Sequence, residues 1–172
     1  MENLPESQFL AGPKNRRLAY NLTEGAGPAV VFLGGFKSDK EGTKAVHLES
    51  WAKRNGRAFL RFDYSGHGQS SEDFTDGAIG DWFEDACAAL ELIDGPAILV
   101  GSSMGGWISL LVSRAMPEKV AGLVTIAAAP DFTEDSMWAG FSDAQKAELE
   151  AGQVALPSDY GEPYIITKRL IE

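Results

Sequence analysis

One segment constrains the fold of this chain more than any other: an apolar run ends in a Gly-Ser turn, and an amphipathic stretch follows at once. Residues 98–100 (Ile-Leu-Val) form the run, residues 101–105 (Gly-Ser-Ser-Met-Gly) the turn, and residues 106–111 the amphipathic stretch. This order predicts a buried strand, a tight turn and a helix. Small residues at 101 and 105 allow the strand and the helix to approach each other without steric clash.

The rest of the chain alternates in the same way between apolar runs of strand length and segments with apolar residues at helical spacing. Besides the run before Gly101, we predict strands at 16–22, 29–33, 58–62 and 123–129, and helices at 44–54, 79–93 and 104–115. Residues 1–15 are polar and predicted to be irregular. Strands that alternate with helices predict an α/β fold with a mainly parallel sheet and helices on both faces.

The length of 172 residues is that of one domain with room for a hydrophobic core. The hydrophobic content of 44% and the charged content of 23% are ordinary for a globular protein. There are no internal repeats, low-complexity tracts or linkers. We therefore expect residues 1–172 to belong to a single domain.

The formal net charge of −10 disfavours nucleic acids and anionic membrane surfaces as partners, because both require a basic face. No apolar run approaches the length that spans a bilayer. The first residues show no secretory signal, and the single cysteine, Cys87, rules out an internal disulfide and fits a reducing compartment. These features predict a cytoplasmic protein.

The Gly-Ser turn also places a serine where it can act as a nucleophile. Residues 101–105 fit the pattern G-x-S-x-G, in which a strained strand-to-helix turn exposes the hydroxyl of the central serine, here Ser103. Because Ser103 precedes the helix, the unpaired N–H of Met104 can stabilise a developing oxyanion. A serine that only caps the helix is the alternative, and the strand and helix on either side favour the nucleophile.

Other candidates for chemistry are few. Cys87 lies on the apolar face of its predicted helix and is interpreted as a small buried residue. Asp63 is expected to brace its own loop through backbone N–H groups. No group of His, Cys, Asp or Glu has the spacing of a metal site, and no Gly-rich stretch matches a phosphate-binding loop. We therefore predict no metal and no cofactor.

Three motifs in this order resemble those of the α/β-hydrolase superfamily, over most of residues 16–172. They are residues 33–36 (Leu-Gly-Gly-Phe), residues 61–70 (Arg-Phe-Asp-Tyr-Ser-Gly-His-Gly-Gln-Ser) and the turn at 101–105. The resemblance implies an α/β-hydrolase core with Ser103 as the nucleophile. It also implies that the backbone N–H of Phe36 lies beside that of Met104 and that both are directed at one carbonyl oxygen.

The exact residues of the motifs are similar to those of one branch of the superfamily, the mitochondrial palmitoyl-protein thioesterases and acyl-glucuronide esterases with their bacterial relatives. The likeness rests on residues 35–36, 42–45, 61–66 and 101–107. It implies a serine hydrolase that cleaves an ester or thioester of a small molecule or an acylated protein, through an acyl-Ser103 intermediate.

The sequence departs from the family pattern in its second half. Family members carry a triad acid after the seventh strand and a histidine after the eighth, whereas this sequence has no histidine after Ser103. Residues 132–172 correspond to the start of a cap or lid, and residues 164–172 begin an amphipathic helix that no Gly, Asn or Pro closes. We therefore expect a C-terminally truncated chain that lacks the last strands, with the acid and the histidine supplied by absent sequence or by a second chain.

Three alternatives stay open. His67 lies at the same end of the sheet as Ser103 and is a candidate base, although a histidine at this point of the family's loop is often not catalytic, which favours a structural role. Asp131 stands where some members carry the acid, and we favour a turn. The third alternative is a catalytically inactive hydrolase that serves as a binding or interaction module.

Truncation has a consequence for partners. In the family's strand order the predicted strand at 123–129 becomes an apolar open edge of the sheet. Such an edge pairs readily with another chain. We therefore expect a homodimer or a complex with a complementary C-terminal fragment.

Overall fold

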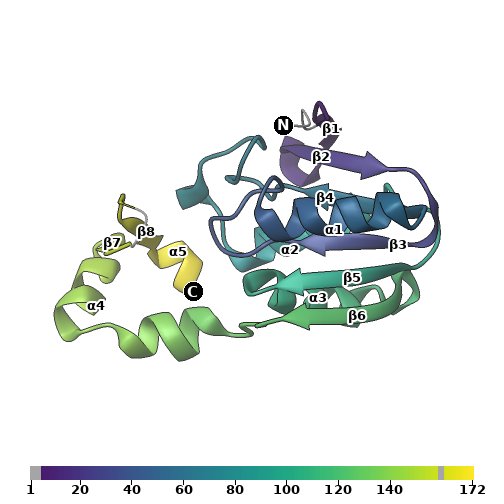
Figure 1. Ribbon diagram of the computed structural model, residues 1–172. Helices are drawn as coiled ribbons and strands as arrows, with labels where there is room; N and C mark the ends of the chain where they lie inside the picture. The colour runs from purple at the N-terminus through teal and green to yellow at the C-terminus, as the bar shows by residue number, and fades with distance from the viewer. Residues whose placement is uncertain (1–4, 159–160) are drawn as a thin grey trace.

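The computed structural model describes residues 5–158 and 161–172. Its main sheet has six strands in the order β1-β2-β4-β3-β5-β6 (Figure 1). The strands are β1 (Gln8–Ala11), β2 (Arg17–Thr23), β3 (Ala26–Leu33), β4 (Arg57–Phe62), β5 (Ala97–Ser102) and β6 (Val120–Ile126). The last four in this list are parallel to one another, and β1 and β2 form the antiparallel edge. The predicted α/β fold with a mainly parallel sheet is confirmed.

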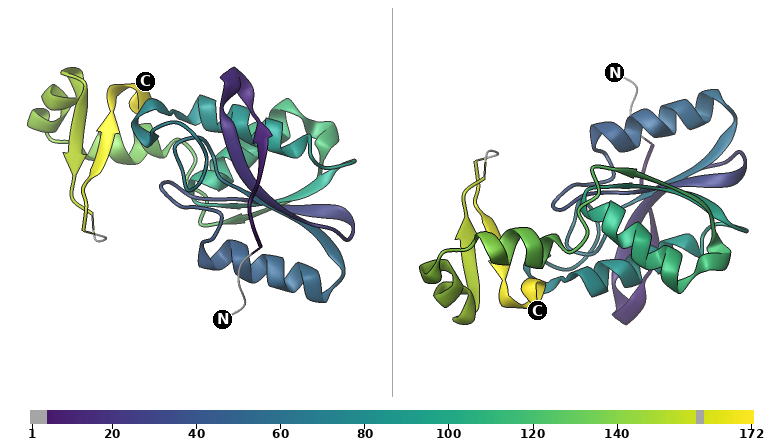
Figure 2. Two further views of the ribbon diagram at one scale, coloured as in Figure 1. Left: turned by 90° about the horizontal axis from the view of Figure 1, so that it is seen from above. Right: turned by 90° about the horizontal axis from the view of Figure 1, so that it is seen from below.

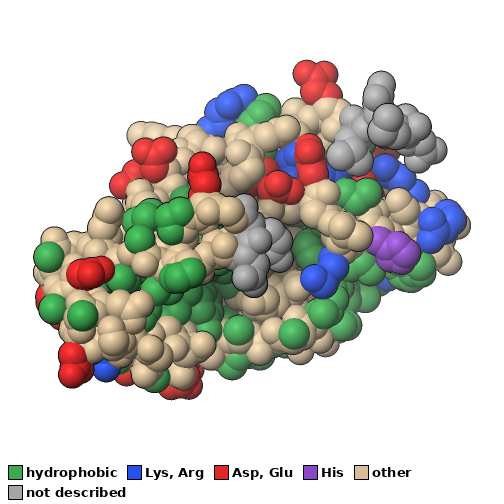
Figure 3. All heavy atoms as spheres, turned by 60° about the vertical axis from the view of Figure 1, so that its left-hand side comes forward, with side chains coloured by type: hydrophobic (Ala, Val, Ile, Leu, Met, Phe, Trp, Pro, Cys, Tyr) green, Lys and Arg blue, Asp and Glu red, His purple; other side chains and the backbone are tan. Residues whose placement is uncertain are grey.

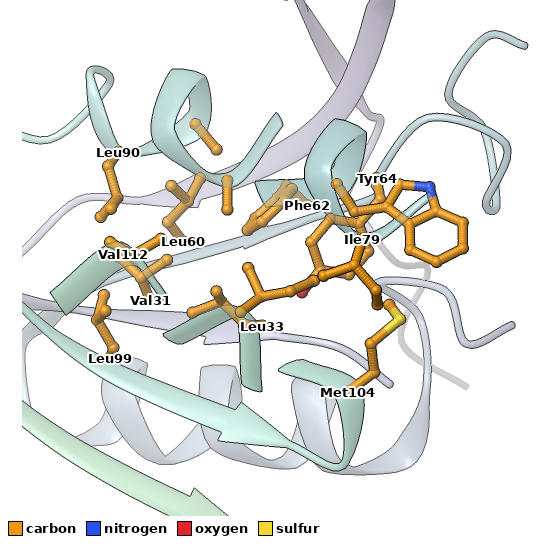
Figure 4. Packing of buried hydrophobic residues seen from close by; sticks show 14 of the residues in the cluster. Val31, Leu33, Leu60, Phe62, Tyr64, Ile79, Leu90, Leu99, Met104 and Val112 are labelled. Carbon is orange, nitrogen blue, oxygen red and sulfur yellow. The ribbon is translucent and has the colours of Figure 1, made fainter. Parts of the chain in front are cut away.

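Helices cover both faces of the sheet, with α1 (Thr43–Arg54) on one side and α2 (Ile79–Leu90) and α3 (Met104–Ala115) on the other (Figure 2). Along β3, Val30 and Phe32 belong to the core beneath α1, whereas Val31 and Leu33 belong to the core beneath α2 and α3 (Figure 4). Alternate side chains of a strand point to opposite faces. The strand is therefore apolar throughout because both of its faces are buried.

A second, smaller unit follows β6 and lies beyond the carboxyl ends of the parallel strands (Figure 1). It contains a π-helical segment (Thr133–Trp138), α4 (Asp143–Glu150), a hairpin of β7 (Gln153–Leu156) and β8 (Tyr164–Thr167), and α5 (Lys168–Ile171). Ser142 and Gln145 form a reciprocal capping box at the start of α4. Short 3-10 helices at Pro13–Asn15, Phe74–Asp76 and Pro117–Lys119 complete the described chain, in which no helix combines the length and hydropathy needed to cross a membrane.

Several predicted elements or boundaries are wrong. The strand predicted at 29–33 begins at Ala26, and the helix predicted at 79–93 ends at Leu90. Residues 164–172 do not form one helix: the β-branched and aromatic residues at 164–167 pair with β7, and only then does α5 begin, capped by the Thr167 hydroxyl. Residues 1–15 contain β1, which pairs with β2. β6 ends at Ile126 rather than at 129, because Ala127 has a φ of 46° and turns the chain out of the sheet.

β6 is an edge strand, as the sequence predicts. Leu123 is 37% exposed and Val124 is 51% exposed. Neighbouring residues of a strand point to opposite faces, so both faces of the sheet are partly bare at this edge.

Candidate active site

Ser103 occupies the turn between β5 and α3, in a backbone conformation that few residues adopt. Its φ is 55° and its ψ is −119°, a strained geometry that costs about 1–3 kcal/mol in a residue other than glycine. Three hydrogen bonds hold it there. The Ser103 N–H donates to the Ile126 carbonyl (2.9 Å), and the Ser103 carbonyl accepts from Gly106 (2.9 Å) and Ala129 (3.2 Å).

The two glycines of the G-x-S-x-G pattern are explained by close backbone approach. A Cβ on Gly101 would overlap the carbonyl oxygen of Gly105, and a Cβ on Gly105 would overlap that of Leu33. The first turn of α3 is therefore packed against the ends of both β5 and β3. This packing brings Ser103 to the loop that follows β3.

That loop passes the serine at Gly35, the residue that directly precedes Phe36. A Cβ on Gly35 would lie 3.4 Å from the Ser103 Cβ, which shows how closely the loop passes. Met104 is the first residue of α3, where backbone N–H groups have no partner within the helix. Within residues 5–158 and 161–172, the N–H groups of Phe36 and Met104 have no hydrogen-bond acceptor. The structure thus brings together the three predicted site residues, Phe36, Ser103 and Met104.

The side chains of Met104 and Phe36 are packed against other parts of the protein rather than directed at a ligand. Met104 is fully buried in the core beneath α2 and α3 (Figure 4). The Phe36 ring packs edge-on against Phe74 (5.0 Å between centroids), Phe132 (5.6 Å) and Tyr164 (6.1 Å). Each of the two residues can therefore offer its backbone N–H to a ligand while its side chain anchors that N–H.

Sequence reasoning missed Phe132 and Tyr164, which belong to the second unit. The Phe132 ring contacts the Phe36 ring and also the ring of Trp107, with 5.8 Å between the centroids of Phe132 and Trp107. Trp107 lies one helical turn after Ser103. Phe132 thus connects the two segments that flank the serine. No periodicity marks these residues, because Phe132 directly precedes the π-helical segment and Tyr164 lies in a short hairpin, and neither segment follows a simple hydrophobic pattern.

An arginine ties the second unit to α2 and to the 3-10 helix that precedes α2. Arg169 of α5 donates to the Asp81 carboxylate (2.6 Å) and to the Asp76 carbonyl (2.9 Å). These contacts hold the unit beside the candidate site at the ends of the strands. On the face drawn in Figure 3, the unit exposes hydrophobic side chains between acidic ones.

Asp63 braces two loops, not only its own as predicted. One carboxylate oxygen accepts the N–H of Gln69 (2.9 Å), and the other accepts the N–H of Lys40 in the loop after β3 (2.6 Å). Burial raises the pKa of Asp63. A Cβ on Gly68, which has a φ of 48°, would overlap the Asp63 carboxylate, so glycine is required there.

His67 has a structural position, which agrees with the favoured interpretation. It is 4% exposed, its Nε2 accepts the Lys37 N–H (3.2 Å), and its Nδ1 lies 3.0 Å from the Ser65 carbonyl. These partners assign the neutral tautomer with the proton on Nδ1. Burial, opposed by the Ser65 hydrogen bond, lowers the pKa of His67 to about 4. With both nitrogens engaged, His67 has no free lone pair for the Ser103 proton.

The remaining histidine of the sequence and the other candidates also have ordinary positions. The remaining histidine, His47, is exposed on α1. The carbonyl of Asp131 accepts the N–H groups of Glu134 and Asp135, so this residue starts a turn. Burial raises the pKa of the Cys87 thiol, which disfavours the reactive thiolate. No cluster of potential metal ligands occurs in the part of the chain that the structure describes.

Comparison with curated proteins bears on both the family and the compartment. Palmitoyl-protein thioesterase ABHD10, mitochondrial, from Rattus norvegicus is 40% identical over 153 residues, which are 88% of this chain and 52% of that protein. The Homo sapiens protein is 40% identical over 156 residues (90% and 51%). The chain thus spans about half the length of these curated relatives.

These relatives overturn the predicted cytoplasmic location, because they are mitochondrial proteins. The prediction rested on the net charge, the single cysteine, and the lack of a recognisable secretory signal or of a bilayer-spanning run in the sequence. None of these properties distinguishes one reducing compartment from another.

Comparison with solved structures and with protein families supports the same family assignment. Alpha/beta hydrolase domain-containing protein 10 from mouse superposes with a TM-score of 0.85 at 36% identity, covering 97% of this chain and 68% of that chain. A crystal structure of a protein from Agrobacterium vitis S4 gives a TM-score of 0.90 at 38% identity (96% and 69%). Residues 30–167 match the Alpha/beta hydrolase family. The predicted resemblance is confirmed, and this chain belongs to the alpha/beta hydrolase family.

Proposed function

We propose that this chain carries the nucleophile of a serine hydrolase that cleaves a carboxylic ester or thioester. The observation that carries the proposal is the strained turn at Ser103, flanked by the unpaired N–H groups of Phe36 and Met104. Donors placed at a developing oxyanion are among the largest contributions to acyl-transfer catalysis. The thioesterase relatives support an ester or thioester as the substrate class.

In the proposed mechanism the Ser103 Oγ attacks the carbonyl carbon of the acyl group and loses its proton to a general base. The carbonyl oxygen becomes an oxyanion and accepts hydrogen bonds from the N–H groups of Phe36 and Met104. Collapse of this intermediate expels the alcohol or thiol, which takes the proton from the base, and leaves acyl-Ser103. A water molecule then attacks the acyl carbon by the same route and releases the acid.

The general base and the acid that orients it are proposed to come from outside these 172 residues. The sequence has no histidine after Ser103, and both nitrogens of His67 are engaged. We further propose that residues 132–172 are the start of a lid over the site, within one incomplete domain. The bare edge of β6 supports pairing with a second copy of the chain or with a complementary C-terminal segment.

A fluorophosphonate probe tests the proposal, with the modified residue located by mass spectrometry. We expect labelling at Ser103, at a rate below that of a complete triad but above that of exposed serines, since a site without its base still retains oxyanion stabilisation. Ser103→Ala should abolish labelling. A folded chain that labels nowhere, or labels equally in Ser103→Ala, would contradict the proposal and favour a catalytically inactive binding module.

A further inference from the structure

The candidate oxyanion donor Phe36 lies in a β-turn whose third residue adopts an unfavourable conformation. The Ser38 N–H donates to the Gly35 carbonyl (3.1 Å), which makes Phe36 and Lys37 the central residues of the turn. Lys37 has a φ of 53°. This region favours glycine and is strained for a lysine. A contact from outside the turn can offset the cost of this conformation.

His67 supplies that contact. Its Nε2 accepts the Lys37 N–H at 3.2 Å, and this is the peptide that directly follows Phe36. The imidazole is fixed in turn by the Ser65 carbonyl (3.0 Å) and by the rings of Phe74 (5.3 Å) and Trp82 (5.0 Å). A rigid, buried acceptor thus meets the strained residue of the turn.

The loop after β4 binds the loop after β3 at two further points. The Tyr64 hydroxyl donates to the Gly34 carbonyl (3.3 Å), and the Asp63 carboxylate accepts the Lys40 N–H (2.6 Å). These two contacts lie on either side of the turn formed by residues 35–38. Among the hydrogen bonds of residues 5–158 and 161–172, that of His67 is the one that joins another segment to the turn itself.

We propose that His67 is a positioning residue, which through the Lys37 N–H holds the turn at residues 35–38 so that the Phe36 N–H faces the oxygen of a group bound at Ser103. The inference rests on the proposed function for the role of Phe36. It assigns His67 a part in the reaction without any proton transfer. A base at this position would have to exchange a proton with Ser103, whereas a positioning residue needs only an acceptor at the site of Nε2.

Three variants separate these roles. His67→Gln keeps an acceptor near the position of Nε2, His67→Asn keeps polar atoms only near the position of Nδ1, and His67→Phe keeps only the ring packing. Tyr64→Phe is the matched control, because it removes one contact to the same loop outside the turn. Each variant is compared with the wild-type 172-residue chain by amide hydrogen exchange of Lys37 and by the rate of fluorophosphonate labelling of Ser103 across pH.

We expect the Lys37 amide hydrogen to exchange with solvent about fivefold faster in His67→Phe and His67→Asn, because each variant lacks the hydrogen bond to His67. Ser103 labelling should slow about tenfold in both, less than the roughly 100-fold to 1000-fold cost of deleting an oxyanion donor. His67→Gln and Tyr64→Phe should stay within about twofold of wild type for both measurements, with an unchanged pH profile.

Unchanged Lys37 exchange in His67→Phe and His67→Asn would overturn the inference. Equal loss of labelling in His67→Gln and His67→Phe would also overturn it, because the acceptor alone would then be insufficient. A wild-type chain that does not label at Ser103 would contradict the proposed function instead. In that case Lys37 exchange would still decide whether His67 holds the turn.

Discussion

At the scale of single residues, His67 shows how burial determines protonation. The ring is surrounded by aromatic side chains, its Nδ1 proton is directed at the Ser65 carbonyl, and its Nε2 accepts from Lys37. Protonation would place a charge in this apolar setting and remove the acceptor that the Lys37 N–H requires. Burial, in part offset by the Ser65 carbonyl and reinforced by the Lys37 ammonium, accordingly lowers the pKa of His67 to about 4.

This pKa predicts how stability depends on pH. Unfolded His67 takes a proton near its ordinary pKa of 6.5, whereas the folded protein takes it only near 4, so acid favours the unfolded state between these values. We expect His67 to lower the free energy of unfolding by about 2–3 kcal/mol between pH 7 and pH 4.5. Urea unfolding of wild type and His67→Gln at both pH values measures this.

The difference in the pH dependence of unfolding between wild type and His67→Gln separates the contribution of His67 from that of the carboxylates. Burial raises the pKa of Asp63 and of Asp85, so these groups change stability in the opposite direction as the pH falls. Their contribution is the same in wild type and in His67→Gln. Equal pH dependence in the two proteins would contradict the assignment of a buried neutral His67.

At the scale of elements, the turn from β5 into α3 depends on backbone contact at Gly105. A methyl group there would overlap the Leu33 carbonyl, whereas Gly80, in the first turn of α2, has open space around it. We expect Gly105→Ala to destabilise the protein by about 1–3 kcal/mol through overpacking. Gly80→Ala should stabilise it by up to about 1 kcal/mol through helix propensity.

Urea denaturation of the two alanine variants beside wild type measures both effects. Both substitutions add one methyl group to a helix, so they differ only in the space available. If Gly105→Ala were as stable as wild type, the close approach of β3 to α3 would be wrong.

Strands β2 to β6 and helices α1 to α3 could be predicted because their apolar residues follow a regular pattern, whereas β1 was missed because it is four residues long and mostly exposed. β3 is apolar throughout because helices cover both of its faces, and α2 shows an apolar stripe because only one side of it is buried. The hairpin of β7 and β8 could not be predicted, since each strand has four residues and is defined by its partner. In the candidate site, local sequence predicted Ser103 and Met104, and the family resemblance predicted Phe36. Phe132 and Tyr164 were missed because only tertiary packing brings them to the site.

At the scale of the whole molecule, the two edges of the main sheet differ. β1 forms one edge, where the guanidinium of Arg17 covers the Phe9 ring at 3.3 Å. β6 forms the other, where Leu123 and Val124 are exposed without such cover. Charged side chains on edge strands are a common protection against pairing with other chains, and the exposed face at Val124 lacks one.

We expect the wild-type chain to self-associate through this edge at micromolar concentration. Val124→Lys should shift it toward the monomer, because a lysine on an edge strand resists strand pairing. Light scattering of the two proteins at equal concentration measures the change, with Leu110→Lys, an exposed position on α3, as the control. A wild-type chain that is already monomeric would contradict the expectation.

The most direct measurement on the candidate site is a crystal structure of this chain phosphonylated at Ser103. We predict that the phosphoryl oxygen lies within about 2.7–3.1 Å of the backbone nitrogens of both Phe36 and Met104, the separation of an oxyanion from its donors. An oxygen that points to solvent, with neither N–H in hydrogen-bonding distance, would contradict the assignment of these two groups as the oxyanion hole.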